Sequence, residues 1–457
     1  HGRCRVAHGD AGNRRYQRSL CSDADARLGA QPQARGRKLY GLQGLAKAGG
    51  EGLHEGSEHV SGYVPAARYC VRQLTLTDFR CYGHLRLNLA GGPVVLGGPN
   101  GAGKTNILEA LSLLVPGRGL RRARLSEIGR QIAGAATDEA VASVAVPWGV
   151  AARVETPDGA ADLGTGFTVA TDGGSERRAV RIDGENERNQ AVLARHMSVH
   201  WLTPQMDRLF QDGASARRRF LDRLVFGWDP AHAGRVSSYE QAMRQRLKLL
   251  RGDRPADPAW LRAQEETMAA RGIAVAAARA DVVARLAGVA AENWGPFPGA
   301  AIAIDGEVDA WLFDSPALEA EDRFRARLSE DRDRDGRLGR THTGPHLSDL
   351  LVRHQPKNEA AARCSTGEQK ALLIALVLAN ARVRAAEDGG VPLLLLDEVA
   401  AHLDAKRRDA LFDGLLGLGA QAWFAGTDVE TFAGLAGAAQ FYNVEDAQLI
   451  ETPTAGT

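Results

Sequence analysis

Hydrophobic and polar residues alternate from Val71 onward as they do in half-buried β-strands. The segments VRQLTLTDF (71–79) and LRLNL (85–89) follow this period of two, and VVL (94–96) is a short apolar run typical of a buried strand. From Asn106 to Leu114 the apolar residues recur at helical spacing. The predicted order is therefore strand, glycine-rich loop, helix.

Two further regions have patterns of their own. Between Ala140 and Arg181 the strand-like runs VASVAV, FTVAT and RAVRID are interrupted by Asp-Gly and Gly-Gly pairs, which favour the tight turns of an antiparallel sheet. From Pro230 to Trp294 the sequence consists of charged, helix-forming stretches with few breakers inside them. We expect two long antiparallel helices here, which form an arm.

Helix and strand patterns alternate again after Ala361. We expect an apolar helix at 370–384, a strand LLLLDE at 393–398, a helix at 406–416 and a strand AWFAG at 422–426. Alternation of this kind is typical of an α/β domain.

Composition matters mainly for what it excludes. At 457 residues, with 44% hydrophobic and 25% charged residues, the chain is long enough for two or three globular domains, and its net charge of +1 does not decide whether it binds nucleic acid. Its longest apolar runs are shorter than the roughly 18 residues of a membrane helix. The cysteines show no paired spacing, which favours a reducing compartment, so we expect a cytoplasmic protein without a membrane partner. The five cysteines are Cys4, Cys21, Cys70, Cys81 and Cys364.

Residues 1–69 show neither helical nor strand periodicity, are rich in Gly, Arg, Ala and Ser, and contain no methionine. Two interpretations stay open. The segment is either a disordered basic arm that contacts nucleic acid or non-native sequence upstream of the true start. We expect the second.

The segment GPNGAGKT (98–105) matches the P-loop pattern G-x-x-x-x-G-K-[ST], between a predicted buried strand and a predicted helix. Its glycines let the backbone turn N–H groups inward at a helix N-terminus, where the helix dipole also favours phosphate. We expect Lys104 to contact the β- and γ-phosphates and to act in catalysis, and Thr105 to bind Mg²⁺. A glycine-rich turn without a ligand is the alternative. The residues expected to bind ATP here are Gly98, Pro99, Asn100, Gly101, Ala102, Gly103, Lys104, Thr105 and Asn106.

The strand LLLLDE ends in two carboxylates, as a central parallel strand does when its C-terminal end opens on a ligand site. We expect Asp397 to hold magnesium through water and Glu398 to act as the general base that polarises the attacking water. Many buried strands end in acids, so this prediction depends on the P-loop upstream.

STGEQK (365–370) resembles the ABC signature, and one short apolar helix separates it from the acidic strand, as in ABC proteins. In that family the signature Ser and Gly bind the γ-phosphate held by the P-loop of the other protomer, which implies an ATP-dependent homodimer. The residues assigned to this contact in trans are Ser365, Gly367, Glu368 and Gln369. The alternative is a capped helix start, Ser or Thr followed by Glu.

AHLD (401–404) resembles the ABC D-loop, and Asp404 has a helix N-cap as its simpler interpretation; both roles are compatible. Transporter ATPases carry a switch histidine after the next strand, whereas this chain offers Thr427 and Asp428. The γ-phosphate sensor is therefore left open.

About 260 residues separate the P-loop from the signature, more than in a transporter ATPase and far fewer than the coiled coil of SMC proteins requires. This proportion resembles the RecF recombination-repair family, SMC-like ATPases with a short helical lobe. Local segments from about Val71 to Glu451 support the resemblance. They are LTLTDFRCY, TNILEAL, VRIDGE, WLTPQMDRLF, ARRRFLDR and HTGPHLSDL, in family order.

The resemblance assigns two further positions to ATP binding. Arg80 would lie near the nucleotide, and Gln205 would lie between ATP and the helical lobe. Gln205 stands where relatives commonly carry Glu, and Leu347 where they often carry a basic residue. His346 is either a satisfied core histidine or a ligand or sensor.

The cluster Arg217, Arg218 and Arg219 has two interpretations, a solvated helix face or contacts to a DNA backbone. The resemblance implies binding of double-stranded and gapped DNA as an ATP-dependent dimer that works with RecR and RecO to load RecA, near the nucleoid. Two alternatives stay open. One is the ATPase subunit of an ABC transporter, and the other is a nucleotide-latched DNA-binding scaffold with negligible turnover.

The fold class we expect is α/β, an ABC/SMC-type P-loop ATPase head with an antiparallel β-layer and a short helical-arm lobe. The domains would be an extension at 1–69, the N-terminal part of the ATPase lobe at 70–228, the helical arm at 229–330 and the C-terminal part of the ATPase lobe at 331–457.

Overall fold

The structure is a computed structural model of the chain. It describes residues 69–130, 146–168, 177–252, 257–387 and 390–452. The predicted extension, apart from Tyr69, and most of the predicted strand VASVAV therefore lie outside the described residues, and the domain boundaries stay a prediction.

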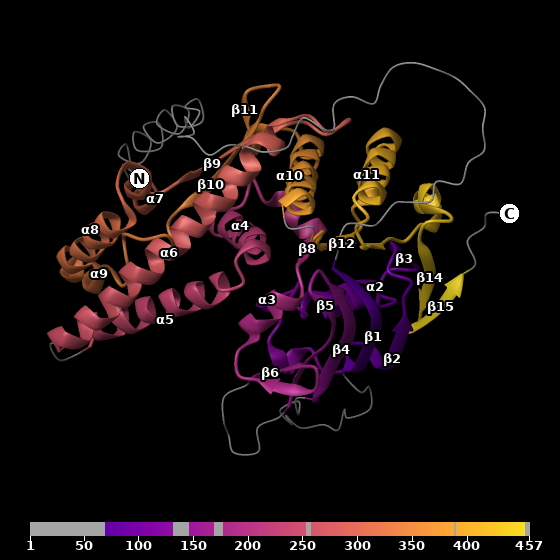
Figure 1. Cartoon of the computed structure of the whole chain (residues 1–457), viewed down its shortest axis with the longest axis horizontal. Helices are drawn as coiled ribbons and strands as arrows, with labels where there is room; N and C mark the ends of the chain where they lie inside the picture. Colours follow the sequence, from indigo (N-terminus) through magenta and orange to yellow (C-terminus); the bar gives the residue numbers. More distant parts are fainter. Residues whose placement is uncertain (1–68, 131–145, 169–176, 253–256, 388–389, 453–457) are drawn as a thin grey trace, which may run out of the picture. The chain divides into compact units, whose positions relative to one another are not determined.

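A six-stranded, mainly parallel sheet forms the centre of the fold (Figure 1). Its strand order is β15-β14-β3-β13-β12-β8, and among the described strands only β15 runs antiparallel to its neighbour. The strands are β3 (Val94–Gly97), β8 (Val199–Leu202), β12 (Leu393–Asp397), β13 (Ala422–Ala425), β14 (Gln440–Glu445) and β15 (Gln448–Thr452).

Both faces of this sheet are buried, which explains the unbroken apolar run of β12. Leu393 and Leu395 pack into one hydrophobic core, and Leu394 and Leu396 pack into another on the opposite face. Successive side chains of a strand point to opposite faces, so a strand covered on both sides needs apolar residues at every position.

An antiparallel sheet and helix α2 (Lys104–Ser112) share the first of these cores. The sheet has the order β2-β1-β4-β5-β6-β7. Its strands are β1 (Cys70–Phe79), β2 (Tyr82–Asn88), β4 (Trp148–Thr156), β5 (Gly159–Phe167), β6 (Arg178–Ile182) and β7 (Glu185–Glu187).

The opposite core lies under α4 (Ala214–Trp228), α10 (Thr366–Glu387) and α11 (Ala405–Gly417). It continues into a three-stranded antiparallel sheet of the order β11-β10-β9. Its strands are β9 (Ala300–Asp305), β10 (Asp349–His354) and β11 (Glu359–Ala360). The remaining short helices are α3 (Leu193–His196), η1 (Leu125–Glu127), η2 (Gln190–Val192), η3 (Pro204–Arg208), η4 (Ala361–Arg363), η5 (Ala400–His402) and η6 (Val429–Leu435).

The predicted arm is built on α5 (His232–Leu250) and α6 (Pro258–Ala291), which run antiparallel. Arg246 meets Glu265, while Tyr239, earlier in α5, lies beside Gly272, later in α6. Three helices that the sequence patterns did not predict complete this lobe, and the first two of them share a small core with the two long ones. They are α7 (Glu307–Asp314), α8 (Ala317–Glu330) and α9 (Arg332–Leu338).

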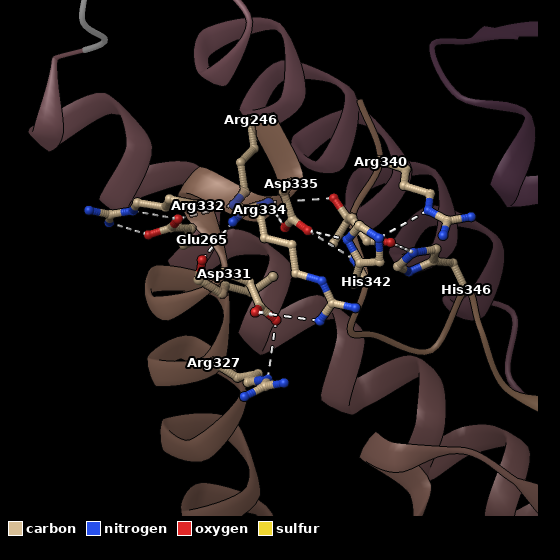
Figure 2. Close-up of polar contacts among 12 residues, drawn as sticks. Arg246, Glu265, Arg327, Asp331, Arg332, Arg334, Asp335, Arg340, His342 and His346 are labelled. Carbon is tan, nitrogen blue, oxygen red and sulfur yellow. Dashed lines mark hydrogen bonds and ion pairs between the residues drawn. The ribbon is translucent and has the colours of Figure 1, made fainter. Parts of the chain in front are cut away.

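Figure 2 shows a buried charge network that joins the arm helices. Arg246 has no exposed surface and donates to Glu265 at 3.0 Å and to Asp335 at 2.6 Å. Asp335 also accepts from the His342 ring at 2.7 Å, which ties α9 to the segment that leads into β10. A buried charge needs such partners, so the network fixes the arm helices relative to one another.

The strand and helix predictions of the head are confirmed within a few residues, but strands β4 and most of β5 were not predicted. FTVAT (167–171) was predicted as a strand; β5 ends at its first residue, Phe167, and residues 169–171 lie outside the described residues. The inward positions of β5 do alternate, at Ala161, Leu163, Thr165 and Phe167, but the glycines and aspartate between them conceal the pattern. Of the helices in the described ranges, none has the length and apolar character needed to cross a bilayer.

Candidate functional site

The C-terminal ends of three neighbouring parallel strands bring the predicted motifs together. Asp397, at the end of β12, pairs in register with Ala425 of β13, and Ala425 pairs with Leu96 of β3. The P-loop follows β3 directly. The two nucleotide motifs, separated by almost 300 positions in sequence, therefore meet at one edge of the sheet, where ligands of open α/β sheets bind.

The P-loop backbone has the conformation that its glycines predict. Gly98, Gly101 and Gly103 have φ angles of 135°, 83° and 116°, a region that costs side-chain-bearing residues energy. The Lys104 ammonium is buried within the loop and donates to the carbonyls of Gly98 at 2.6 Å and Pro99 at 2.8 Å. Burial lowers the pKa of Lys104, and the Glu398 and Asp397 carboxylates oppose that shift.

Thr105 and Asp397 form the candidate magnesium site. The Thr105 hydroxyl donates to the Asp397 carboxylate at 3.0 Å, and Asp397 is buried. Burial raises the pKa of Asp397, while the Thr105 hydrogen bond lowers it. In the described ranges no group of three or more His, Cys, Asp or Glu side chains could hold a metal. One hydroxyl and one carboxylate fit Mg²⁺, which keeps waters and takes its other ligands from phosphate.

Glu398 stands immediately after the strand in an unusual backbone conformation. Its φ angle is 54°, and its N–H donates to the carbonyl of Ala425 at 2.9 Å. Left-handed backbone at a residue with a side chain costs roughly 1–2 kcal/mol, and such conformations cluster at functional sites. The neighbouring hydrogen bond from β13 holds this turn, so the sheet fixes the position of the predicted base.

The turn between β1 and β2 packs directly on the P-loop. A Cβ atom at Gly103 would lie 2.6 Å from the Tyr82 hydroxyl and 2.8 Å from the Cys81 sulfur. The Asn106 amide donates to that sulfur at 3.1 Å. Gly103 is therefore required twice, for its backbone conformation and for this close contact.

Arg80, predicted near the nucleotide, is tied to the P-loop helix. It donates to both carboxylate oxygens of Glu109, at 2.8 and 2.6 Å, and to the carbonyl of Glu127 at 2.8 Å. Glu109 is buried in α2, five residues after Lys104. In this structure the guanidinium of Arg80 therefore braces α2, and its contact with nucleotide stays a prediction.

Gln205 lies in η3, which follows β8 at the same edge of the sheet, and its side chain is exposed. Two residues later, Asp207 lies 3.7 Å from the Lys370 ammonium, in the first turns of α10. Burial lowers the pKa of Lys370, which Asp207 and Glu398 counteract. The segment around Gln205 thus contacts the signature helix of the same chain.

The signature segment presents its first turn to solvent. Ser365, Thr366 and Gly367 are exposed, and a Cβ at Gly367 would meet no atom within 4 Å. Glu368 closes a reciprocal cap, because the Ser365 N–H donates to its carboxylate at 3.0 Å and the Glu368 N–H donates to the Ser365 hydroxyl oxygen at 3.4 Å. Lys357 and this cap lower the pKa of Glu368 to about 2.

The capped helix start and the anion site are therefore compatible interpretations of the same residues. The cap uses the oxygen of Ser365 as an acceptor and leaves its proton available to a phosphate oxygen. A helix N-terminus that carries free N–H groups favours anions. Gln369 differs, because it is buried and donates to the carbonyl of Cys364 at 2.9 Å, so its side chain supports the signature from inside its own protomer.

The remaining predicted positions have well-defined partners. Asp404 caps α11 by accepting from the Arg407 N–H at 2.9 Å, and Asp428 caps η6. The His346 ring bonds the Tyr239 hydroxyl through Nδ1 at 2.6 Å and the Thr341 carbonyl through Nε2 at 3.1 Å. His346 is therefore a satisfied histidine, and burial lowers its pKa.

The arginine cluster of α4 divides into three different environments. Arg217 makes a bidentate ion pair with Asp349 of β10 at 2.7 Å, and Arg218 donates to the Ser348 carbonyl at 2.6 Å. Arg219 is exposed and bonds the Ser215 hydroxyl of its own helix. Arg217 is thus committed within the fold, while Arg219 remains accessible.

Sequence reasoning missed two residues around the site. Arg121 donates to the Asn106 side chain at 2.6 Å and to Glu109 at 3.1 Å, and Lys370 pairs with Asp207. The lone carboxylate of Glu109 within the otherwise apolar run ILEAL of α2 was a signal for a buried ion pair. Nothing in the linear pattern identified its partners.

Comparisons with known proteins identify the family. The family model "RecF/RecN/SMC N terminal domain" matches residues 70–425. The DNA replication and repair protein RecF of Mesorhizobium japonicum is 48% identical over 384 residues, which cover 84% of this chain and 97% of that protein. RecF of a Caulobacter species is 47% identical, with 84% and 98% covered.

A solved structure has the same fold. A structure described as the recombination mediator protein RecF-ATP in the RecFOR pathway aligns with a TM-score of 0.70, at 19% identity, and covers 86% of this chain and 100% of that one.

Proposed function

This chain belongs to the RecF family of SMC-like ATPases, and from that premise we propose that it is an ATP-dependent DNA clamp of replication and recombinational repair. ATP and Mg²⁺ would occupy the edge of the parallel sheet. Two protomers would close on each other with ATP between them, on double-stranded and gapped DNA. Membership of this family excludes a transporter ATPase.

The observation that carries the proposal is the division of the site. Lys104, Thr105, Asp397 and Glu398 gather at one sheet edge, while the first turn of the signature is exposed and its Ser365 proton is free. A helix N-terminus without an anion of its own is suited to the γ-phosphate of a second protomer. The functional unit is then the dimer.

In the mechanism, each residue acts through its own geometry. The P-loop N–H groups and Lys104 hold the phosphates, and Thr105 with Asp397 would hold Mg²⁺, which neutralises phosphate charge when bound. Glu398 polarises the attacking water and takes its proton, a role typically worth about 10² to 10⁴ in rate. Hydrolysis then opens the dimer and releases DNA. We expect weak, DNA-stimulated turnover.

We also assign partners by the family relationship. The solved relative belongs to a RecFOR pathway, so RecO and RecR are the proposed partners, and loading of RecA is the proposed outcome. With DNA as the proposed ligand, we propose a cytoplasmic location near the nucleoid. Backbone recognition of DNA should be insensitive to sequence and strongly dependent on salt.

Replacing the base should trap the closed clamp. Glu398→Gln leaves Thr105 and Asp397 in place, so ATP still closes the dimer but turnover falls by about 10² to 10⁴. Light scattering with ATP and gapped DNA should show a long-lived dimer on DNA for the variant and a transient one for the wild type. Glu319→Gln, an exposed position of α8, is the matched control.

The results separate the possible functions. A Glu398→Gln protein that stays monomeric at saturating ATP contradicts the split site. Wild-type turnover that is negligible with and without gapped DNA, together with an unchanged dimer lifetime in the variant, would instead support the nucleotide-latched scaffold.

A further inference from the structure

A cavity of about 250 Å³ lies between α4, α5 and α6 and the loop that follows α2. Of the residues that the structure describes, four arginines and two carboxylates, Asp222 and Glu240, line it. The arginines are Arg122, Arg218, Arg219 and Arg279. The cavity therefore carries an excess of positive charge.

The floor of the cavity is internally neutral and well fixed. Arg279 is buried and donates to both oxygens of Asp222, at 2.8 and 2.9 Å, and to the Pro345 carbonyl at 2.6 Å. Burial alone would raise the pKa of Asp222, but Arg279 and His232 hold it at about 2. His346, which lines the cavity beside Tyr239, belongs to the segment anchored by the charge network in Figure 2.

The rim is not neutralised in the same way. Among the described residues Arg219 bonds only a hydroxyl, that of Ser215, and Arg218 bonds the Ser348 carbonyl. Within the described part of the chain Arg122 makes no hydrogen bond or ion pair, and its backbone is held at a φ of 58°. Burial and the neighbouring Arg219 and Arg118 lower the pKa of Arg122, as expected for like charges held together, while Glu240 acts in the opposite direction.

We propose that this cavity binds a phosphate group of a DNA strand. Its volume is below the roughly 300–1,000 Å³ of pockets for whole small molecules, so a small anion fits better than an intact cofactor. Two accessible guanidinium groups, those of Arg122 and Arg219, lie with the Ser215 hydroxyl around one space. Several donors around a small space suit a phosphate with its several acceptor oxygens. The identification of DNA as the source rests on the proposed function.

The rim is also connected to the nucleotide site through the chain. Arg121 bonds Asn106 and Glu109 of the P-loop helix, and the next residue, Arg122, lines the cavity. A displacement of α2 on binding ATP would therefore move the rim. This adjacency predicts that phosphate binding in the cavity depends on the nucleotide.

The first experiment measures DNA binding. Arg122→Gln combined with Arg219→Gln removes two exposed charges and leaves the floor intact, so the protein should fold. Anisotropy with gapped duplex and ATP should show roughly tenfold weaker binding and a salt dependence shallower by about 1, since one phosphate contact is lost. Arg262→Gln, exposed on α6 outside the cavity, should change neither value appreciably.

The second experiment measures the binding of inorganic phosphate alone. It compares the thermal unfolding temperature in phosphate with that in chloride at equal ionic strength. Phosphate should stabilise the wild type and Arg262→Gln more than the double variant. The P-loop is intact in all three, so the difference reports the cavity. Equal stabilisation would overturn the site.

The two experiments distinguish failure of the proposed anion site from failure of the proposed function. Weaker phosphate stabilisation with unchanged DNA binding would confirm an anion site and overturn DNA as its source. If the wild type binds no DNA, the proposed function fails, and the phosphate experiment still decides whether the cavity is a site.

Discussion

At the scale of single residues, neighbouring carboxylates have different environments. Asp397 remains in the sheet, buried and bonded to Thr105, whereas Glu398 leaves the strand through a left-handed turn. Two identical chemical groups thus become a candidate metal ligand and a candidate base because the backbone changes between them. The pair Asp-Glu could be predicted from sequence, but the turn that separates their roles could not.

The burial of His200 predicts how the stability of the fold depends on pH. The ring is bonded to the Asn380 amide at 3.0 Å, and burial, then Arg384 and Arg223, lower its pKa from 6.5 to about 3. Between these values the unfolded chain binds a proton that the folded protein does not, so stability falls as pH falls below 6.5. Below pH 6.5 the free energy of unfolding should fall more steeply with falling pH in the wild type than in His200→Gln. The difference between the two slopes should be up to about 1.4 kcal/mol per pH unit.

Urea unfolding at several pH values measures this difference. His84→Gln, at an exposed position of β2, should retain the wild-type slope. Parallel slopes for wild type and His200→Gln would show that His200 does not take part.

The limits of sequence prediction at this scale are set by distance along the chain. The Thr105–Asp397 pair was accessible because each half belongs to a recognisable motif. Arg217 was proposed as a DNA contact, and its actual partner, Asp349, is 132 residues away in a strand that no pattern identified. The sequence alone does not show whether an arginine is solvated or forms an ion pair within the fold.

At the scale of elements, the site depends on a hairpin outside the nucleotide motifs. The turn between β1 and β2 contacts Gly103, so the antiparallel sheet supports the P-loop from one side. The strands of this hairpin were predicted well, because one face is buried and the alternation is regular. Strand β5 was missed, because glycines replace the residues that reveal a strand.

A pair of glycine substitutions tests this support. Gly103→Ala adds a contact with Tyr82 and Cys81 to the cost of left-handed backbone, whereas Gly101→Ala, with a φ of 83° and no atom within 4 Å, has the backbone cost alone, about 1–2 kcal/mol. Titration with a fluorescent ATP analogue should therefore show a larger loss of affinity for Gly103→Ala. Equal losses of affinity would mean that the turn between β1 and β2 shifts to accommodate the added methyl group at little cost. Gly149→Ala, in open space in β4, serves as the neutral control.

At the scale of the whole molecule, the sequence patterns predicted only part of the helical arm and its surroundings. Helices α5 and α6 were expected, but α7, α8 and α9 were not, nor was the sheet of β9, β10 and β11. Their residues are highly charged, as in RFRARLSEDRDRDGR, and part of that charge forms the internal network around Arg246. Buried ion pairs give no hydrophobic pattern, so this part of the fold could not be recognised.

Two inactive variants should restore each other if the site is shared between protomers. Lys104→Ala disables the P-loop, and Ser365→Arg blocks the exposed signature. Each alone should lose hydrolysis, but a mixed dimer contains one intact P-loop facing one intact signature. An equal mixture should recover at most roughly a quarter of wild-type turnover, because random pairing makes about half of the dimers mixed and each mixed dimer has one intact site of two.

Steady-state ATPase assays of the mixture measure this recovery. No recovery, in a mixture that still forms mixed dimers, would place the whole active site within one chain. Lys104→Ala alone, at the same total protein concentration, gives the baseline rate of hydrolysis.

The adjacency of Arg121 and Arg122 has a thermodynamic consequence. If ATP at the P-loop strengthens phosphate binding at the rim by some factor, an occupied rim must strengthen ATP binding by that same factor, since the coupling free energy belongs to both ligands. DNA would then act as an effector of nucleotide affinity. The protein would retain ATP where DNA is bound and release it more readily elsewhere, without needing a separate sensor.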